Sequence, residues 1–242
     1  RIISIYPTLR NNIWCVTADS KLYLYDTHLC KFVNRGKEIN EKFGIDLRVD
    51  KVYPLKTGNT WITAKSANYL IRNYMLPDQS FESEIIKVGQ HGLRSGNVWH
   101  VWADKKRREW ILTDKGTTIY NHHFSTQLPF KWIREVGENI FLATPNGKLA
   151  VYDEKEHLVM IPMPAGVTRI NQLKNTGYQL LIATNIGLVV YNPRTFKTEV
   201  INVQSPGQPM AEVKNIYTDA YGMVWVFTDG MGVTMVNPRT GQ

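Results

Sequence analysis

The sequence has few of the features that mark specialised classes of protein. It contains only two cysteines, Cys15 and Cys30, which are too few for a scaffold built on disulfides. No stretch approaches the roughly 18 consecutive apolar residues of a membrane span. Glycine (17 residues) and proline (11) are at ordinary levels, which excludes collagen-like and low-complexity chains. The 43% hydrophobic and 11% aromatic content is enough for a folded core and excludes wholesale disorder.

The charge balance is basic but dispersed. The 242 residues hold 29 Lys and Arg against 21 Asp and Glu, a net charge of +8. Such a balance favours anionic partners only where the basic residues cluster. They are spread along the whole chain, with one dense run at Lys105–Arg108. This run falls in an expected hairpin turn, so a solvated turn is the simpler interpretation and an anion site the alternative. We expect no nucleic-acid partner.

A short apolar motif with a bulky first residue and a small last one occurs six times. The copies are Trp14–Thr17, Trp61–Ala64, Trp110–Thr113, Phe141–Thr144, Leu181–Thr184 and Trp225–Thr228. Successive copies are 31 to 49 residues apart, about 42 on average. A stretch of alternating apolar residues precedes most copies of the motif, and a polar turn separates this stretch from the motif. A second turn, a third apolar run and a looser fourth run follow. The sequence therefore repeats a unit of four short strands.

Four strands per unit at this period predict a β-propeller, with each unit forming one blade. We expect an all-β fold with about six blades, at residues 1–46, 47–96, 97–128, 129–165, 166–211 and 212–242. The bulky first residues are expected to fill the space between blades, and the small last residue to permit close approach before the second turn. A β-sandwich does not require the same tetrapeptide in every unit. A helical solenoid is excluded because no window holds a helical apolar stripe for three turns.

Residues 213–233, followed by Asn237-Pro238, resemble the two-component regulator propeller repeat. That repeat has an apolar start, then Asp, two residues, Gly, an apolar residue and Trp, and closes on Gly-Leu and Tyr-Asp-Pro. Residues 167–193 and 98–121 resemble it next best, and residues 2–26, 49–73 and 130–153 are degenerate matches. The resemblance covers nearly the whole chain.

The resemblance implies a sensor. Such repeats fill the periplasmic half of hybrid sensor histidine kinases that cross the membrane once, in glycan-using Bacteroides-like bacteria. It implies a periplasmic location within an inner-membrane protein and a saccharide ligand. The net charge of +8 and the basic residues expected on one face favour an oligosaccharide that is acidic or highly hydroxylated. The implied partners are a neighbouring propeller or immunoglobulin-like domain of the same chain, and a second copy in a full-length homodimer. A propeller enzyme of the lyase or lactone-hydrolase type and a protein-interaction scaffold are the alternatives.

We expect the sequence to be a piece of a larger propeller, of seven blades by the resemblance. It begins at Arg1 without a Met, directly on an expected first strand, and ends just after an expected third strand. This pattern indicates five full blades and most of a sixth. No kinase or nucleotide-binding motif is present in the sequence.

The sequence shows no recognisable set of catalytic or metal-binding residues. No nucleophile lies in a Gly-x-Ser-x-Gly pattern, so we expect no enzyme activity and no cofactor in this piece. His122 and His123 are adjacent, and on a strand they would point to opposite faces, so loop histidines are expected rather than metal ligands. Cys15 and Cys30 are expected on the second and fourth strands of one blade, too far apart to bond.

The best candidate binding residues lie in linkers and turns, because binding concentrates on loops over rigid scaffolds. We expect these segments to emerge on one face of the propeller and to give it a cationic, hydrogen-bonding character. Linker 34–47 contributes Arg35 and Lys37, and linker 76–97 contributes His91 and Arg94. The turns after the repeated motif contribute Lys115, Asn146, Asn185 and Asp229.

Overall fold

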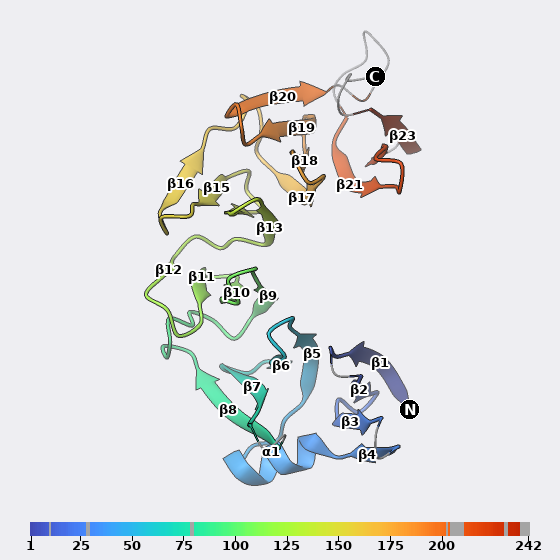
Figure 1. The fold of residues 1–242 in the computed structure, drawn as a ribbon, viewed down its shortest axis with the longest axis vertical. Coiled ribbons are helices and arrows are strands. Elements are labelled where there is room, and N and C mark those ends of the chain that lie inside the picture. The colour runs from blue at the N-terminus through green and yellow to red at the C-terminus, as the bar shows by residue number, and fades with distance from the viewer. Residues whose placement is uncertain are drawn as a thin grey trace. The chain divides into compact units, whose positions relative to one another are not determined.

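The computed structural model describes residues 1–242 except 10, 28–29, 78–79, 202, 204–210, 230–231 and 238–242. Pro238 of the closing repeat motif therefore lies outside the described residues. The chain forms two compact units, Arg1–Pro129 and Phe130–Gln242. Each unit contains three antiparallel sheets, and each sheet is one copy of the repeat (Figure 1).

The first unit holds three sheets of four strands, each a meander of consecutive strands. The first sheet comprises β1 (Ile2–Pro7), β2 (Ile13–Thr17), β3 (Leu22–Asp26) and β4 (Lys31–Val33). The second comprises β5 (Val49–Pro54), β6 (Thr60–Ala64), β7 (Tyr69–Met75) and β8 (Phe81–Lys87). The third comprises β9 (Val98–Ala103), β10 (Glu109–Thr113), β11 (Gly116–Ile119) and β12 (Ser125–Thr126).

The second unit repeats the pattern. Its first sheet comprises β13 (Trp132–Val136), β14 (Asn139–Ala143), β15 (Leu149–Tyr152) and β16 (Leu158–Ile161). Its second comprises β17 (Ile170–Asn175), β18 (Leu180–Thr184), β19 (Gly187–Asn192) and β20 (Lys197–Ile201). The described part of its third sheet has three strands, β21 (Val213–Thr218), β22 (Val224–Thr228) and β23 (Gly232–Val236). The prediction of four-stranded all-β blades is confirmed; that residues 1–242 form a single propeller domain stays a prediction.

One segment departs from the sequence-based prediction. Residues expected to form an irregular linker include a helix, α1 (Arg35–Phe43), beside the outer strand β8 (Figure 1). Asn34 caps its start by accepting from the Lys37 N–H at 3.0 Å, and Gly44 ends it with φ 63°. At nine residues, or two and a half turns, α1 is too short to show an apolar stripe over three helical turns. Among the described residues, no helix is long and apolar enough to cross a membrane.

The repeated motif forms the core between adjacent sheets. Trp14 packs with Val49, Val52 and Ile62 of the second sheet, and Trp61 packs with Val101 and Ile111 of the third. The side chains of Trp61 and Trp110 have no exposed surface. Trp14 and Trp61 therefore fill the space between neighbouring blades of the first unit, as expected.

Candidate functional site

A cleft of about 630 Å³, the first cleft, lies beside α1 in the first unit. It is bounded by the turn after β2, the segment before β5, and the residue that follows β6. The charged side chains that line it are Asp19, Lys21, Lys37, Glu41, Asp46, Arg48 and Lys65. Four bases and three acids give these residues a net charge of +1. Neutral hydrogen-bonding groups, Ser20, Asn34 and Asn40, complete the polar lining.

The charges in the first cleft form local pairs that remain open to solvent. Lys21 Nζ lies 2.9 Å from Asp19 Oδ2, and Lys37 Nζ lies 3.7 Å from Glu41 Oε1. These four side chains are 59 to 69% exposed, so each pair contributes little to stability and can rearrange around a ligand. Hydrogen bonds from Thr17 and Lys21 lower the pKa of Asp19 to about 2, and the bond with Asp19 raises the pKa of Lys21.

One face of helix α1 forms a wall of the first cleft. Gly36, Lys37, Asn40 and Glu41 recur at the spacing of one helix face and all line the cleft. The opposite side of the helix is attached to the second sheet: Lys42 pairs with Glu82 and donates to the Ser83 carbonyl at 2.8 Å. This attachment holds the cleft wall against β8.

A second cleft of about 620 Å³ shares Lys65 with the first and lies between the second and third sheets. Its polar lining includes Asp50, Ser66, Asn68, Ser95 and Asn97. The two loops that form it touch at Gly96, where an added Cβ would lie 1.8 Å from the Ala67 carbonyl oxygen. Only a glycine permits this approach. The two clefts therefore meet at Lys65, directly after β6.

The last residue of the repeated motif shapes the turn that follows it in a way that sequence analysis missed. The Thr17 hydroxyl accepts from the Lys21 N–H at 3.1 Å, and Thr113 Oγ1 donates to the Gly116 carbonyl at 2.7 Å. Thr184 Oγ1 donates likewise to the Gly187 carbonyl at 2.8 Å. The threonine therefore closes the turn with its own hydroxyl, in addition to being small. Its recurrence in five of the six motif copies was the available signal.

The two candidate binding residues from linker 34–47, Arg35 and Lys37, lie in different environments. Lys37 lines the first cleft, whereas Arg35, two residues earlier, does not. Its guanidinium pairs with Glu38 and lies 5.4 Å from the centre of the Phe81 ring. Burial lowers the pKa of Arg35. The structure therefore gives Arg35 a packing role beside β8.

The candidates from linker 76–97 cover the third sheet instead of lining either cleft. Arg94 Nε donates to Ser125 Oγ at 3.3 Å, and the His91 ring lies 5.2 Å from that of Tyr120. Lys115 is exposed at the β10–β11 turn, next to Asp114, which accepts from Asn97 Nδ2 at 3.2 Å. Since Asn97 lines the second cleft, the backbone at Lys115 lies beside that cleft.

The candidates in the second unit have partners in their own turns and linkers. Asn185 Oδ1 accepts from the N–H groups of Thr168 and Arg169 at 2.8 and 3.0 Å, which ties that linker to the turn. Asn146 accepts from the hydroxyl of Thr144, and Asp229 Oδ2 lies 3.5 Å from Lys214 Nζ. No described cavity of the second unit brings these three residues together.

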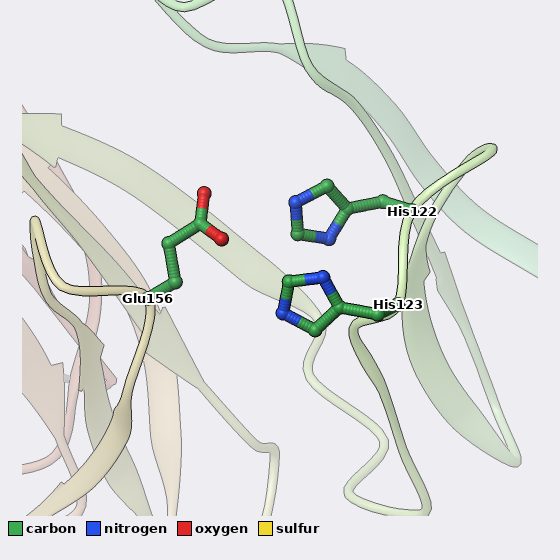
Figure 2. A group of neighbouring side chains, drawn as sticks. All are labelled: His122, His123 and Glu156. Carbon is green, nitrogen blue, oxygen red and sulfur yellow. The ribbon is translucent and has the colours of Figure 1, made fainter.

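The adjacent histidines lie in the loop between β11 and β12, as expected. Their rings stack with centres 4.1 Å apart (Figure 2). His122 Nδ1 accepts from the Phe124 N–H at 3.2 Å, so it is engaged in the turn. Glu156, also labelled in Figure 2, belongs to the second unit, in the turn before β16.

Both cysteines are free, as predicted. Cys15 is buried in β2, and burial raises the pKa of its thiol. The position predicted for Cys30 was wrong, because it lies in the turn before β4 and not on that strand. The difference arises because the turn after β3 is longer than a hairpin turn of two residues.

No family model and no curated protein matches the sequence. Solved structures do match. The extracellular domain of BT3049 from B. thetaiotaomicron, assigned to a hybrid two component system, is 14% identical with a TM-score of 0.58. The match covers 99% of this chain and 34% of that one. The extracellular domain of BT4673 from the same organism, assigned to a one component system, is 16% identical with a TM-score of 0.53. That match covers 98% of this chain and 42% of the BT4673 domain. A virginiamycin B lyase from Staphylococcus aureus is 11% identical with a TM-score of 0.53, and the match covers 97% of this chain and 83% of the lyase.

These similarities establish the fold. The chain has the β-propeller architecture of four-stranded blades, and the resemblance to propeller-built sensor domains is confirmed at the level of the fold. The chain spans between a third and about two fifths of the length of the two B. thetaiotaomicron domains.

Proposed function

We propose that this chain is a ligand-sensing propeller module of the periplasmic region of a hybrid two-component sensor kinase, and that it responds to a saccharide. The first cleft is the observation that carries the proposal, since it is a polar hollow of ligand size walled by turns and a helix. The likeness to extracellular domains of B. thetaiotaomicron signalling proteins supports a sensor in an inner-membrane protein. The module itself performs no catalysis in this proposal.

The lining of the first cleft suits a polyhydroxylated ligand. A sugar hydroxyl both donates and accepts, so it needs donors and acceptors in alternation. Lys37 and Lys65 supply donors, Asp46 supplies acceptors, and the side-chain amide of Asn34 faces the same volume. The excess of one base favours a sugar carrying a carboxylate or sulfate, because charge-assisted hydrogen bonds are about twice as strong as neutral ones.

Binding would be relayed by contact with the rest of the parent protein. The partners in this proposal are a neighbouring propeller or immunoglobulin-like domain, and a second copy of the full-length protein. Attachment of α1 to β8 through Lys42 gives the cleft wall a fixed connection to the second sheet. A ligand that pulls on Lys37 therefore acts on that sheet through the helix.

Titration calorimetry of the chain against acidic and neutral oligosaccharides tests the proposal. We expect an acidic oligosaccharide to bind and Lys37→Ala or Lys65→Ala to weaken binding about tenfold, the loss of one charge-assisted contact. Lys197→Ala, which removes an exposed lysine from β20 in the second unit, is the matched control and should leave the affinity unchanged. Equal binding by all three variants would contradict the proposed site.

A further inference from the structure

The outer strand β16 differs from the other outer strands of the five four-stranded sheets. An outer strand exposes unpaired backbone groups, and proteins protect such edges with charges or by keeping the strand short. The outer strands β8 and β20 each carry charged residues, β4 is three residues long with a lysine, and β12 has only two residues. Strand β16, Leu-Val-Met-Ile, has four residues and no charge. Its central residues Val159 and Met160 are 49% and 45% exposed.

A preformed apolar pocket of about 420 Å³ adjoins this edge. Val159, Met160 and Ile161 form one side of the pocket, and residues of the next blade form the other. Phe141 and Tyr191 are almost fully buried and meet edge to face, with ring centres 5.6 Å apart. Because these rings belong to the core between the two blades, the pocket is held open by rigid elements.

Phe196 lines the pocket from the turn between β19 and β20 and is 78% exposed. Its backbone has φ 58°, a left-handed conformation that is unfavourable for a bulky side chain. Asn192 fixes the turn: its carbonyl accepts from the Phe196 N–H at 2.8 Å and its side chain from the Arg194 N–H at 2.9 Å. The turn thus holds an aromatic ring at the solvent-exposed side of the pocket.

The turn that leads into β16 is acidic, although the chain as a whole is basic. Residues 153–156 are Asp-Glu-Lys-Glu, a net charge of −2, against +8 for the whole chain. Asp153, Glu154 and Lys155 line the pocket, and the Glu154 side chain is exposed. This end of the strand therefore attracts a basic group.

We infer that β16 and this pocket form a docking site for an extended segment of a partner protein. The segment adds a strand to the edge of β16 that no strand of the described residues pairs with. It inserts an apolar side chain between Met160 and Phe196, and places a Lys or Arg beside the acidic turn. Main-chain pairing supplies affinity in such strand addition, and the pocket supplies specificity. This surface lies in the second unit, and the inference does not depend on the saccharide proposal.

Selection of a displayed library of random seven-residue peptides on the 242-residue chain tests this inference. We expect enriched peptides to alternate apolar and polar residues and to carry a Lys or Arg near one end. A synthetic consensus peptide should then bind, and Val159→Lys or Met160→Lys should weaken its binding at least about tenfold. Phe196→Ala should weaken it as well. Glu199→Lys on the outer strand β20 is the matched control and should change the affinity less than about threefold.

Three outcomes would overturn the inference. The first is no enrichment over a library selected on an unrelated protein, and the second is a consensus peptide that binds equally to the Val159→Lys and Met160→Lys chains. The third is a concentration-dependent dimer, seen by sedimentation velocity and abolished by Val159→Lys, which would assign the edge to a second copy of this chain. Circular dichroism of each variant confirms that the sheets are retained, which we expect because Val159 and Met160 are exposed.

Discussion

Asp104 Oδ2 accepts a hydrogen bond from the indole of Trp110 at 3.0 Å, and Asp219 and Trp225 repeat this bond at 2.9 Å with the same spacing of six residues. In each pair the aspartate sits in the first hairpin turn of the blade, and its other oxygen accepts from backbone N–H groups of that turn. In each pair the aspartate therefore joins the indole of the blade's second strand to the backbone of the first hairpin turn.

Replacing Asp104 should destabilise the first unit. Asp104 is fully buried and also pairs with Arg108 at 2.6 Å, so Asp104→Ala removes the hydrogen bonds that an indole, a backbone N–H and a guanidinium donate to it. We expect the free energy of unfolding to fall by about 3 kcal/mol. Urea denaturation measures this, with Asp50→Ala on an exposed position of β5 as a comparison expected to lose much less. A loss below about 1 kcal/mol would show that the bond is dispensable.

Gly96→Ala should disrupt the contact between the loops of the second cleft. An added methyl group would meet the Ala67 carbonyl oxygen at 1.8 Å, so the two loops must separate. We expect a loss of about 3 kcal/mol or more in the free energy of unfolding. Gly58→Ala is the control: nothing lies within 4 Å of its added Cβ, although its φ of 90° costs about 1 kcal/mol. Equal losses for the two variants would argue against the close approach.

The phenol of Tyr120 should lose its proton at a higher pH than that of an ordinary tyrosine. Burial, followed by its 2.8 Å hydrogen bond to Glu84, raises the pKa of Tyr120 to about 12. A raised folded-state pKa means that the contribution of Tyr120 to stability is complete below about pH 10 and is lost as the pH rises through 12. Absorbance titration near 295 nm of the wild type and of Tyr120→Phe should differ by one late-titrating phenol. A difference centred near pH 10 would contradict the environment described.

Glu212 should make the second unit sensitive to acid. It accepts from Asn171 Nδ2 at 2.9 Å and pairs with Lys214 at 2.9 Å and Arg169 at 3.0 Å. These contacts, that with Asn171 first, lower the pKa of Glu212 to about 2. The stability from a depressed carboxyl pKa is present above the unfolded value near 4.5 and is lost as the pH falls toward 2. Glu212→Gln should flatten that part of the stability profile; an unchanged slope between pH 5 and about 2 would count against these contacts.

The blades were predictable from the sequence because the signal is local and repeated. A tetrapeptide such as Trp61–Ala64 marks a buried strand, and the turns beside it mark the hairpins. The bond from Trp61 Nε1 to Glu109 at 3.0 Å joins two blades across 48 residues, and no local pattern indicates it. Six residues before its tryptophan, the second blade has Leu55, where the third and sixth blades have Asp104 and Asp219. Glu109 of the neighbouring blade therefore accepts the hydrogen bond from the Trp61 indole instead.

The candidate site was predicted only in part, and helix α1 is the reason. In a loop, Arg35 and Lys37 would be interchangeable contributors to one cationic surface. On a helix, residues two apart point to different sides, so Lys37 lines the first cleft and Arg35 packs on Phe81. Lys21 and Lys65 line the cleft because the fold brings the turns after β2 and β6 beside the helix, and no local sequence pattern indicates that arrangement.

Hydrogen–deuterium exchange of the chain with and without an acidic oligosaccharide tests the central claim most directly. The account predicts that the ligand slows exchange at residues 18–21, 34–48 and 65, which contain the lining of the first cleft, and leaves β16 unchanged. Slowed exchange confined to other segments, or no change at ligand concentrations that saturate the calorimetric signal, would contradict a saccharide site beside α1.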